Sequence, residues 1–382
     1  MIYFTVICCL AYLAWLVREN RLAHTHRKAL RHVVHVNGIR GKSSVCRLID
    51  AGLRGGGLRV LTKTTGTCPS VIHVDGSEAR LGRRGRPSIK EQLRILRLAA
   101  VQRADVLVIE CMAITPEYQK TSEERMLRSD IGVITNVRLD HPDEMGETLD
   151  EIAEALSHTT PEGGTLFTAE EAYSEFLRGK AGEKGTSLVL SQASGVDHSE
   201  IDFTENVSLA LAVCGHLGVS REMALAGMRQ YRKDPGAFSI ERTIGTRGKQ
   251  LVFLNALAAN DPSSAERILD LVEAQGFMAS GQRLLLVNNR HDRPTRTKQF
   301  IDFAVKHERR FDRIVAAGNS RAQMRRALVK RGIAPGRIVR LGSFSDLAAL
   351  DDDAVVFAVG NIVGSGRIRS EADRKAGIFD VR

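Results

Sequence analysis

The stretch that decides the fold reads RHVVHVNGIRGKSS, residues 31–44. Its first six residues are rich in valine and predict a buried strand. Gly38 and Gly41 then predict a tight turn, and SVCRLIDAGLR, residues 44–54, reads as a helix. A glycine-rich turn between a strand and a helix lets backbone N–H groups face a phosphate, and the helix N-terminus adds positive potential.

This turn predicts a nucleotide-binding site. Lys42 can reach the outer phosphates, and the hydroxyl of Ser43 can bind Mg²⁺. The long form of such a loop has a glycine where Val36 stands, so the match is to the short form, Gly-x-x-Gly-Lys-Ser. The alternative is a basic loop that merely precedes a helix. The loop residues predicted to bind the nucleotide are Asn37, Gly38, Ile39, Arg40, Gly41, Lys42, Ser43 and Ser44.

Outward from the loop, short strand-like runs alternate with helical ones. Residues 59–66, 105–110 and 130–137 read as strands, and residues 89–102 have helical periodicity. This alternation predicts an α/β fold with a mostly parallel sheet covered by helices. Ligands of such sheets gather at the carboxyl ends of the strands.

Polar residues stand at these strand ends. Glu110 closes an apolar run, where a carboxylate is costly unless it meets water, a cation or a partner. It is therefore a candidate Mg²⁺ ligand or water-positioning group, with a solvated strand end as the alternative. Asn136, Asp140 and His141 follow the next strand. An isolated histidine is more often structural, but a third strand-end loop beside the other two favours a shared site.

A hydroxyl-rich segment, Thr64-Thr65-Gly66-Thr67, follows the second predicted strand. Hydroxyls and small residues suit a phosphate or a second Mg²⁺. The alternative is a plain turn, and the residues alone do not separate the two.

The chain reads as two domains. Residues 205–218 and 220–231 have helical patterns, and Asp234-Pro235-Gly236 breaks them. We therefore predict a central ATP-binding domain over residues 32–235 and a smaller α/β domain over residues 236–382. The strands predicted in the second domain are 250–257, 283–289, 313–318 and 354–360.

Composition narrows the possible partners. The 382 residues carry a formal net charge of +10, but only 5% are aromatic and no basic block is interleaved with aromatics. Nucleic acid is therefore a poor candidate, and anionic substrates or a membrane surface are better ones. The six cysteines form no C-x-x-C pair, so neither zinc nor a disulfide framework is expected.

The amino-terminal segment 1–17 is uncharged, and a basic segment 18–31 follows it. As a helix the uncharged segment spans about 25 Å, at the short end for a bilayer crossing. Positive charge after it predicts that the rest of the chain is cytoplasmic. We expect a single anchor helix in the cytoplasmic membrane, followed by a juxtamembrane linker. A buried or interfacial helix is the alternative.

Taken together, the motifs resemble the Mur-ligase superfamily, which includes peptidoglycan ligases and folylpolyglutamate synthetase. The short loop Gly38–Ser43, the strand-end Glu110 and the pair Asn136 and His141 match that superfamily's ATP and metal motifs. Within it, the chain is most similar to the ligase subunits of poly-γ-glutamate synthases. The segments that carry this likeness are VNGIRGKSS, TKTTGT, IECMAITPE, TNVRLDHPDEMG and VGNIVGSG.

The resemblance implies an ATP-dependent carboxylate–amine ligase that forms an acyl phosphate and then an amide. Its substrates would be glutamate and the growing poly-γ-glutamate chain, with other membrane subunits of the synthase as partners. It also implies a P-loop-containing central domain and a smaller Rossmann-like carboxyl-terminal domain. ATP and Mg²⁺ are the implied cofactors.

The resemblance also assigns residues to roles. Catalysis falls to Lys42, Glu110 and His141, and the metal to Ser43, Glu110 and His141. Asn136 joins the nucleotide-binding set. The expected substrate-binding residues are Thr65, Thr67, Arg290, Asp292 and Arg293, because residues 290–293 are similar to a charged loop that faces the family's active site.

Three alternatives stay open. The first is another ligase of the superfamily, of the folate or peptidoglycan type. The second is a P-loop kinase or a simple NTPase. The third is a non-enzymatic subunit that binds nucleotide to gate a partner. Formation of an amide product separates the ligases from the other two.

Overall fold

The structure is a computed structural model that describes residues 2–66, 69–82, 87–140, 142–191, 198, 200–233, 238–257, 259, 261–291, 293–340, 347 and 350–361. The chain divides into two compact units, Met1–Asp234 and Pro235–Arg382. Each unit has its own sheet and its own apolar core, so each is described by itself.

The first unit is built on an eight-stranded sheet with the order β4-β3-β2-β5-β1-β6-β7-β8. β1 (His32–Asn37) lies inside it, parallel to β5 (Val106–Glu110) on one side and to β6 (Ile131–Ile134) on the other. β2 (Val60–Thr64) is parallel to β5. The other strands are β3 (Ser70–Ile72) and β4 (Glu78–Arg80), which form an antiparallel edge, and the parallel β7 (Thr165–Thr168) and β8 (Ser187–Leu190). The predicted α/β fold with a mostly parallel sheet is confirmed.

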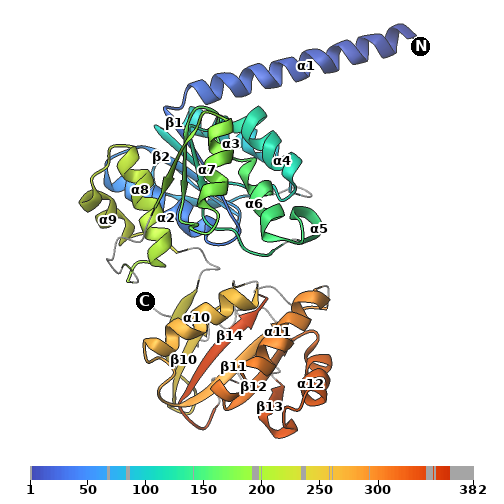
Figure 1. Ribbon diagram of the computed structural model, residues 1–382, viewed down its shortest axis with the longest axis vertical. Helices are drawn as coiled ribbons and strands as arrows, with labels where there is room; N and C mark the ends of the chain where they lie inside the picture. Colours follow the sequence, from blue (N-terminus) through green and yellow to red (C-terminus); the bar gives the residue numbers. More distant parts are fainter. Residues whose placement is uncertain are drawn as a thin grey trace. The chain divides into compact units, whose positions relative to one another are not determined.

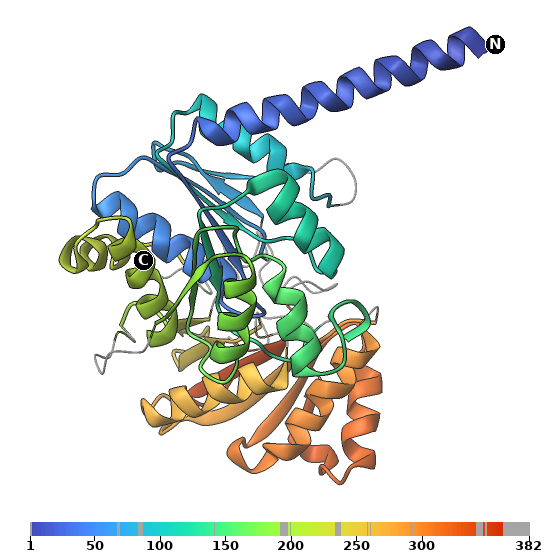
Figure 2. The same ribbon diagram turned by 45° about the horizontal axis from the view of Figure 1, so that its top comes forward.

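Helices cover both faces of this sheet, as both views show (Figure 1, Figure 2). α2 connects β1 to β2 in one direction along the sheet, whereas the later connections run in the other direction. Right-handed crossovers therefore place α2 on one face of the sheet and the helices of the later connections on the other. With α2 (Lys42–Gly55) lie α8 (Thr204–His216) and α9 (Arg221–Met228). The opposite face carries α3 (Glu91–Val101), α4 (Pro116–Thr121), the π-helix η1 (Ser122–Leu127), α6 (Leu149–Ser157) and α7 (Ser174–Glu183), with the short α5 (Pro142–Met145) before α6.

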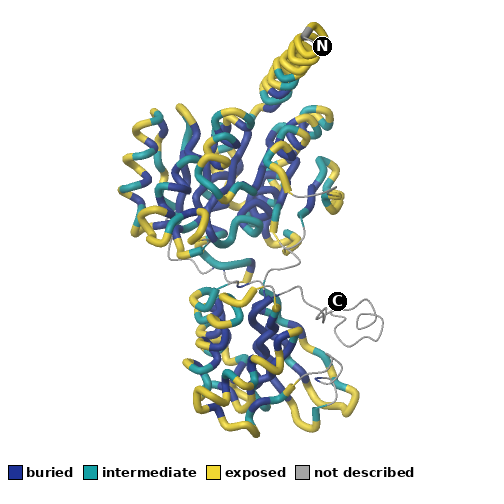
Figure 3. Tube along the Cα trace, turned by 90° about the vertical axis from the view of Figure 1, so that its right-hand side faces the viewer, coloured by how far each residue is buried: buried dark blue, intermediate teal, exposed yellow. Residues whose placement is uncertain are grey.

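Burial on both faces explains why the central strands read as continuous apolar runs. In β1, Val34 and Val36 pack into the core beneath α2, whereas Val33 packs into the core on the opposite face. The alternation of side chains along a strand therefore points His35, like Val33, away from α2. The buried residues fill the interior of each unit (Figure 3).

The second unit has a six-stranded sheet with the order β13-β12-β11-β14-β10-β9. Its strands are parallel except for the edge strand β9, which is antiparallel to β10. The strands are β9 (Ser239–Ile244), β10 (Gln250–Asn255), β11 (Gln282–Asn289), β12 (Arg313–Gly318), β13 (Ile338–Arg340) and β14 (Ala354–Gly360). The helices are α10 (Pro262–Ala274), α11 (Pro294–Lys306) and α12 (Arg321–Lys330), with the 3₁₀ turns η2 (Glu308–Arg310) and η3 (Pro335–Arg337).

The amino-terminal segment is one uninterrupted helix, α1 (Ile2–Lys28). The helix therefore runs through both the segment 1–17 predicted as an anchor and most of the segment 18–31 predicted as a linker, and that division stays a prediction. From Trp15 onward the helix contacts the rest of the first unit, where Arg27 pairs with Asp130 at 2.7 Å and Lys90 lies over the Trp15 ring. Among the described residues, no helix has the length and apolar character needed to cross a bilayer.

Candidate active site

The phosphate loop connects β1 to α2 at the carboxyl edge of the sheet. The connections from β1 and from its neighbour β5 run in opposite directions along the sheet, and ligands bind at such switch points. Gly41 adopts φ +79° directly before α2, and Gly38 adopts φ +121°. A Cβ on Gly38 would lie 2.1 Å from Oγ1 of Thr135, so both the backbone angle and the space require glycine.

Lys42 begins α2 and folds back across its own loop. Its Nζ donates hydrogen bonds to the carbonyl oxygens of Gly38 at 2.6 Å and Ile39 at 3.4 Å. The ammonium group is thus held over the loop whose N–H groups begin the helix. Positive charge and free N–H groups in one place are the requirements of an anion site.

Glu110 joins three segments of the site. The register of β5 against β1 places it opposite Val36, next to the start of the phosphate loop. Its Oε2 accepts a hydrogen bond from the Ser43 hydroxyl at 2.8 Å and another from the backbone N–H of Thr65 at 2.6 Å. The side chain is buried, so these partners replace water around the carboxylate. Three segments predicted separately therefore meet at one carboxylate.

Thr65 makes a contact that the sequence did not predict, and its substrate-binding role stays a prediction. The hydroxyl-rich composition suggested its side chain, but the backbone N–H contacts Glu110. Thr67 lies outside the described residues.

The side-chain amide of Asn136 forms hydrogen bonds with the backbone of the phosphate loop. Its Oδ1 accepts from the N–H of Arg40 and its Nδ2 donates to the Arg40 carbonyl, both at 3.0 Å. Thr135, which the sequence did not single out, donates its hydroxyl to the same carbonyl at 2.6 Å. Both termini of the Asn136 amide are therefore bonded to the loop backbone, so Asn136 shapes the loop from which nucleotide contacts arise.

Arg40 and Asp140 form an ion pair at 3.2 Å, which ties the loop after β6 to the phosphate loop. His141, the next residue, lies outside the described residues, so its metal and catalytic roles stay predictions. Within the described part of the chain, no cluster of three His, Cys, Asp or Glu side chains forms a metal site. The oxygen ligands present are the Ser43 hydroxyl and the Glu110 carboxylate, which suit Mg²⁺ because it often takes one or two protein oxygens beside phosphate and water.

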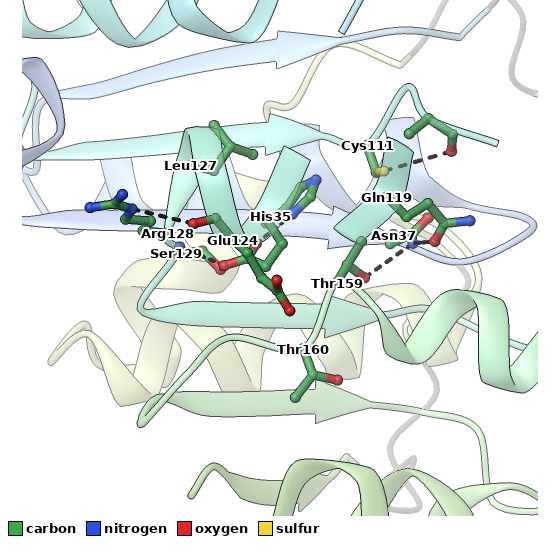
Figure 4. A network of polar contacts seen from close by, with 12 residues as sticks. His35, Asn37, Cys111, Gln119, Glu124, Leu127, Arg128, Ser129, Thr159 and Thr160 are labelled. Carbon is green, nitrogen blue, oxygen red and sulfur yellow. Dashed lines mark hydrogen bonds and ion pairs between the residues drawn. The ribbon is translucent and has the colours of Figure 1, made fainter. Parts of the chain in front are cut away.

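A layer of buried polar contacts lies behind β1, on the face opposite α2 (Figure 4). The Asn37 amide, 2% exposed, donates to Gln119 Oε1 at 2.7 Å and to Thr159 Oγ1 at 3.1 Å. Asn37 was predicted to bind the nucleotide. Its side chain is bonded to α4 and to the loop after α6, so it fixes the end of β1 from inside the protein, and its contact with a nucleotide stays a prediction.

His35 forms the second part of this layer. Its Nδ1 lies 2.8 Å from Oε2 of Glu123 on η1, and both side chains are buried. Burial alone lowers the pKa of His35, but the neighbouring Cys111 and Glu123 outweigh it and raise that pKa to about 9. The other oxygen of Glu123 accepts from the backbone and hydroxyl of Ser129. A charged pair therefore connects the strand beneath the phosphate loop to the π-helix.

Asn206 is a further site residue that sequence reasoning missed. It lies in the first turn of α8, and a Cβ on Gly41 would come 2.8 Å from its Oδ1. Asp202 accepts from its Nδ2 at 2.9 Å. No short motif links Asn206 to the loop, because the two are far apart in sequence, and only the packing of α8 against α2 brings them together.

The charged segment of the second unit begins where β11 ends. Arg290 follows that strand and is half-buried, and Arg293 is the exposed residue directly before α11. Asp292 lies outside the described residues. The structure therefore places two of the three predicted substrate residues of this segment at the carboxyl edge of the second sheet.

Comparison with known proteins places both units. Residues 36–228 match the model of the Mur ligase middle domain, and residues 241–372 match the poly-gamma-glutamate synthase CapB C-terminal domain. The capsule biosynthesis protein CapB of Bacillus anthracis is 34% identical over 96% of this chain and 81% of its own length. The PGA synthase CapB of Bacillus subtilis (strain 168) is 37% identical over 78% of this chain and 77% of its own length.

Solved structures share the fold at low identity. The bifunctional folylpolyglutamate synthase/dihydrofolate synthase of Yersinia pestis, in complex with AMPPNP and a Mn ion, superposes with a TM-score of 0.66 at 16% identity, over 96% of this chain and 98% of its own. MurF of Acinetobacter baumannii gives a TM-score of 0.66 at 13% identity, over 94% and 79% of the two chains. The phosphate loop, the strand-end glutamate and both family matches lead to one conclusion: this chain is a member of the Mur ligase family, on the branch that carries the poly-gamma-glutamate synthase CapB C-terminal domain.

Proposed function

We propose that this chain is the ATP-dependent ligase that joins glutamate into poly-γ-glutamate, through an acyl phosphate and then an amide. The observation that carries the proposal is the junction at Glu110, where the Ser43 hydroxyl and the Thr65 N–H meet one buried carboxylate beside Lys42 and the phosphate loop. Its family supports the reaction class, because the matched models are named for a Mur ligase and for a poly-gamma-glutamate synthase, and one similar protein is named a PGA synthase.

The first step needs positioning and charge neutralisation more than covalent chemistry. The N–H groups at the start of α2 and the ammonium group of Lys42 would bind the β- and γ-phosphates of ATP. The contacts of Lys42 to the Gly38 and Ile39 carbonyls already hold it over the loop. Asn136 and Thr135 keep the loop backbone in the shape that presents these donors.

Mg²⁺ fits the same place. Ser43 and Glu110 would hold it, with His141 as a further proposed ligand, and the ion would supply charge neutralisation for the phosphates. The hydrogen bond between Ser43 and Glu110 shows that hydroxyl and carboxylate oxygens already converge there.

The proposed reaction then proceeds in two steps. A carboxylate oxygen of the acceptor attacks the γ-phosphorus of ATP, the bond to the β-γ bridging oxygen breaks, and ADP leaves with an acyl phosphate formed. The amine of the incoming glutamate attacks the acyl carbon, loses a proton, and displaces inorganic phosphate. We propose that Arg290, Asp292 and Arg293 contribute to substrate binding, with Arg side chains pairing carboxylates.

The test is ATP consumption with L- and D-glutamate, with products followed by mass spectrometry. We expect a ladder of products spaced by one glutamyl residue. Lys42→Ala should lower the rate at least about 100-fold, because removing one charge that stabilises the transition state typically has such an effect. Lys330→Ala, which removes an exposed lysine of the second unit, is the matched control and should retain activity.

Other outcomes separate the alternatives. ATP turnover that is indifferent to every amino acid, with no amide product, would identify an NTPase and refute the proposal. Amide products with another acceptor would assign a different ligase of the same family.

We also propose that α1 attaches the chain to the cytoplasmic membrane, with both units on the cytoplasmic side and other membrane subunits of a synthase as partners. The support is the exposure of large apolar side chains along residues 3–17, such as Tyr3 at 85% and Phe4 at 73%. Such a surface is unfavourable in water. Fractionation tests the proposal, because recovery of the full chain in the soluble fraction without detergent would refute it.

A further inference from the structure

A groove on the second unit lies between α11 and α12, near the carboxyl ends of β11 and β12. It is open to solvent and has a volume of about 310 Å³. Pro294, Thr297, Lys298 and Ile301 line it from α11, at the spacing that places residues on one helix face. From α12 and its flanks come Ser320, Gln323, Met324, Ala327 and Arg331, and Arg290 and His291 close the end nearest β11. We call this the α11–α12 groove.

The groove combines an apolar floor with a basic rim. Ile301 and Met324 are buried at 7% and 0% exposure, which makes the floor apolar. Arg290, Lys298 and Arg331 stand around it, and among the described residues that line it none is acidic. Asp302 pairs with Arg331 from outside the lining. The groove is therefore shaped for a ligand that is apolar along its length and anionic at its edges.

We propose that the α11–α12 groove binds a stretch of the γ-linked glutamyl chain, the anionic polymer itself. This inference rests on the proposed function. Each γ-linked unit contributes two methylene groups, one amide and one free carboxylate. The methylenes match the Ile301 and Met324 floor, the carboxylates match the basic rim, and the amides match polar side chains such as Thr297 and Gln323.

Several weak contacts explain why a chain is favoured over a single glutamate. Contacts between exposed charges are individually weak and are screened by salt. A chain that presents several carboxylates engages several cations at once, and later contacts form with the chain already held nearby. Affinity in this groove should therefore rise with the number of glutamyl residues and fall with ionic strength.

The experiment uses the full chain without ATP and a fluorescently labelled γ-linked oligomer of ten L-glutamyl residues. Fluorescence anisotropy measures binding. We expect Lys298→Glu to weaken binding about tenfold, because it replaces attraction by repulsion at the rim. Arg326→Glu is the matched control: Arg326 is an exposed residue of α12 that does not line the groove, so the same charge change there should leave the affinity within about twofold.

Two competitors test the chemistry. Free glutamate should compete poorly, and an α-linked glutamyl oligomer of the same length and charge should compete less well than the γ-linked one, because its backbone places the methylenes in side chains. Equal weakening by both variants would show a general charge effect and overturn the proposal. Equal competition by vesicles rich in phosphatidylglycerol would assign the groove to a lipid surface and overturn it as well.

A second readout uses catalysis. Lys298→Glu should shift the distribution of product lengths toward short oligomers, measured by mass spectrometry, whereas Arg326→Glu should not. The two proposals can fail separately. Amide synthesis without oligomer binding would support the ligase function and refute binding of the polymer in the groove. Oligomer binding without amide synthesis would support the groove proposal and refute the ligase function.

Discussion

At the scale of single residues, Glu110 explains how a short loop becomes a site. A buried carboxylate without partners is costly, and the Ser43 hydroxyl and Thr65 N–H satisfy this one. Both hydrogen bonds are accepted by Oε2 of the carboxylate, beside the phosphate loop. Ser43 and Thr65 come from segments that are distant in sequence, so the carboxylate also sets the distance between them.

Glu110→Gln tests both this structural role and the proposed role in holding Mg²⁺. The substitution keeps one oxygen that can accept a hydrogen bond but removes the charge. We expect ATP turnover with glutamate to fall about 100-fold, while the free energy of unfolding changes by no more than about 2 kcal/mol. Steady-state kinetics and urea denaturation measure the two effects. Glu117→Gln, at an exposed position of α4, is the matched control. Full activity in Glu110→Gln would contradict the assignment.

At the scale of elements, the site depends on how β1 is held from both faces. α2 covers one face with apolar contacts, and α4 with η1 holds the other through Asn37–Gln119 and His35–Glu123. A buried strand at the place of β1 could be predicted from the valine-rich run. The π-helix could not, because no short motif marks its backbone hydrogen bond from the Arg128 N–H to the Glu123 carbonyl five residues earlier.

The ion pair predicts a pH dependence. The pKa of His35 is raised from 6.5 to about 9 in the folded chain. A raised pKa means that the folded state binds the proton more tightly, so the stabilisation is fully present below pH 6.5 and is lost as the pH rises through about 9. The loss is on the order of 3 kcal/mol. Urea denaturation followed by circular dichroism should show it.

Glu123→Gln supplies the comparison. Without the carboxylate, the pKa of His35 should no longer be raised as far, so the free energy of unfolding should be lower at pH 6.5 and depend less on pH up to 9. The glutamine retains an oxygen that can accept from Ser129. An unchanged pH slope in this variant would mean that the pair does not govern the titration.

At the scale of the whole molecule, α1 consists of an exposed apolar part followed by a part that packs against the rest of the first unit. Its first turns expose large apolar side chains, whereas Trp15, Glu19, His24 and Arg27 contact the rest of the first unit. The part that contacts protein and the part that is exposed are therefore consecutive segments of one helix. The stability of the first unit should depend on the part of α1 that contacts protein. Attachment to a membrane should depend on the exposed part.

A deletion of residues 2–11 separates these roles. It keeps Trp15 over Lys90 and the Arg27–Asp130 pair. We expect the thermal midpoint to stay within about 2 °C, while the chain moves from the membrane to the soluble fraction. Replacement of Phe4, Ile7 and Leu10 by serine, at unchanged length, should have the same effect on fractionation. Membrane recovery of both variants would place the attachment elsewhere.

Local sequence determined much of this protein. The phosphate loop, the strand-end Glu110 and the resemblance to the Mur ligase family all came from short contiguous motifs, and the family and the fold class are confirmed. Such motifs can be recognised in a sequence because neighbouring residues set the backbone angles, the start of a helix and the burial of a strand.

Tertiary structure alone decided the rest. It placed the Thr65 N–H on Glu110, turned the Asn37 amide away from the loop, brought Asn206 over Gly41, and formed the groove between α11 and α12. Each of these contacts joins residues whose separation along the chain is bridged by strand register and helix packing. Those are properties of the whole sheet and its cover, which no short stretch of sequence contains.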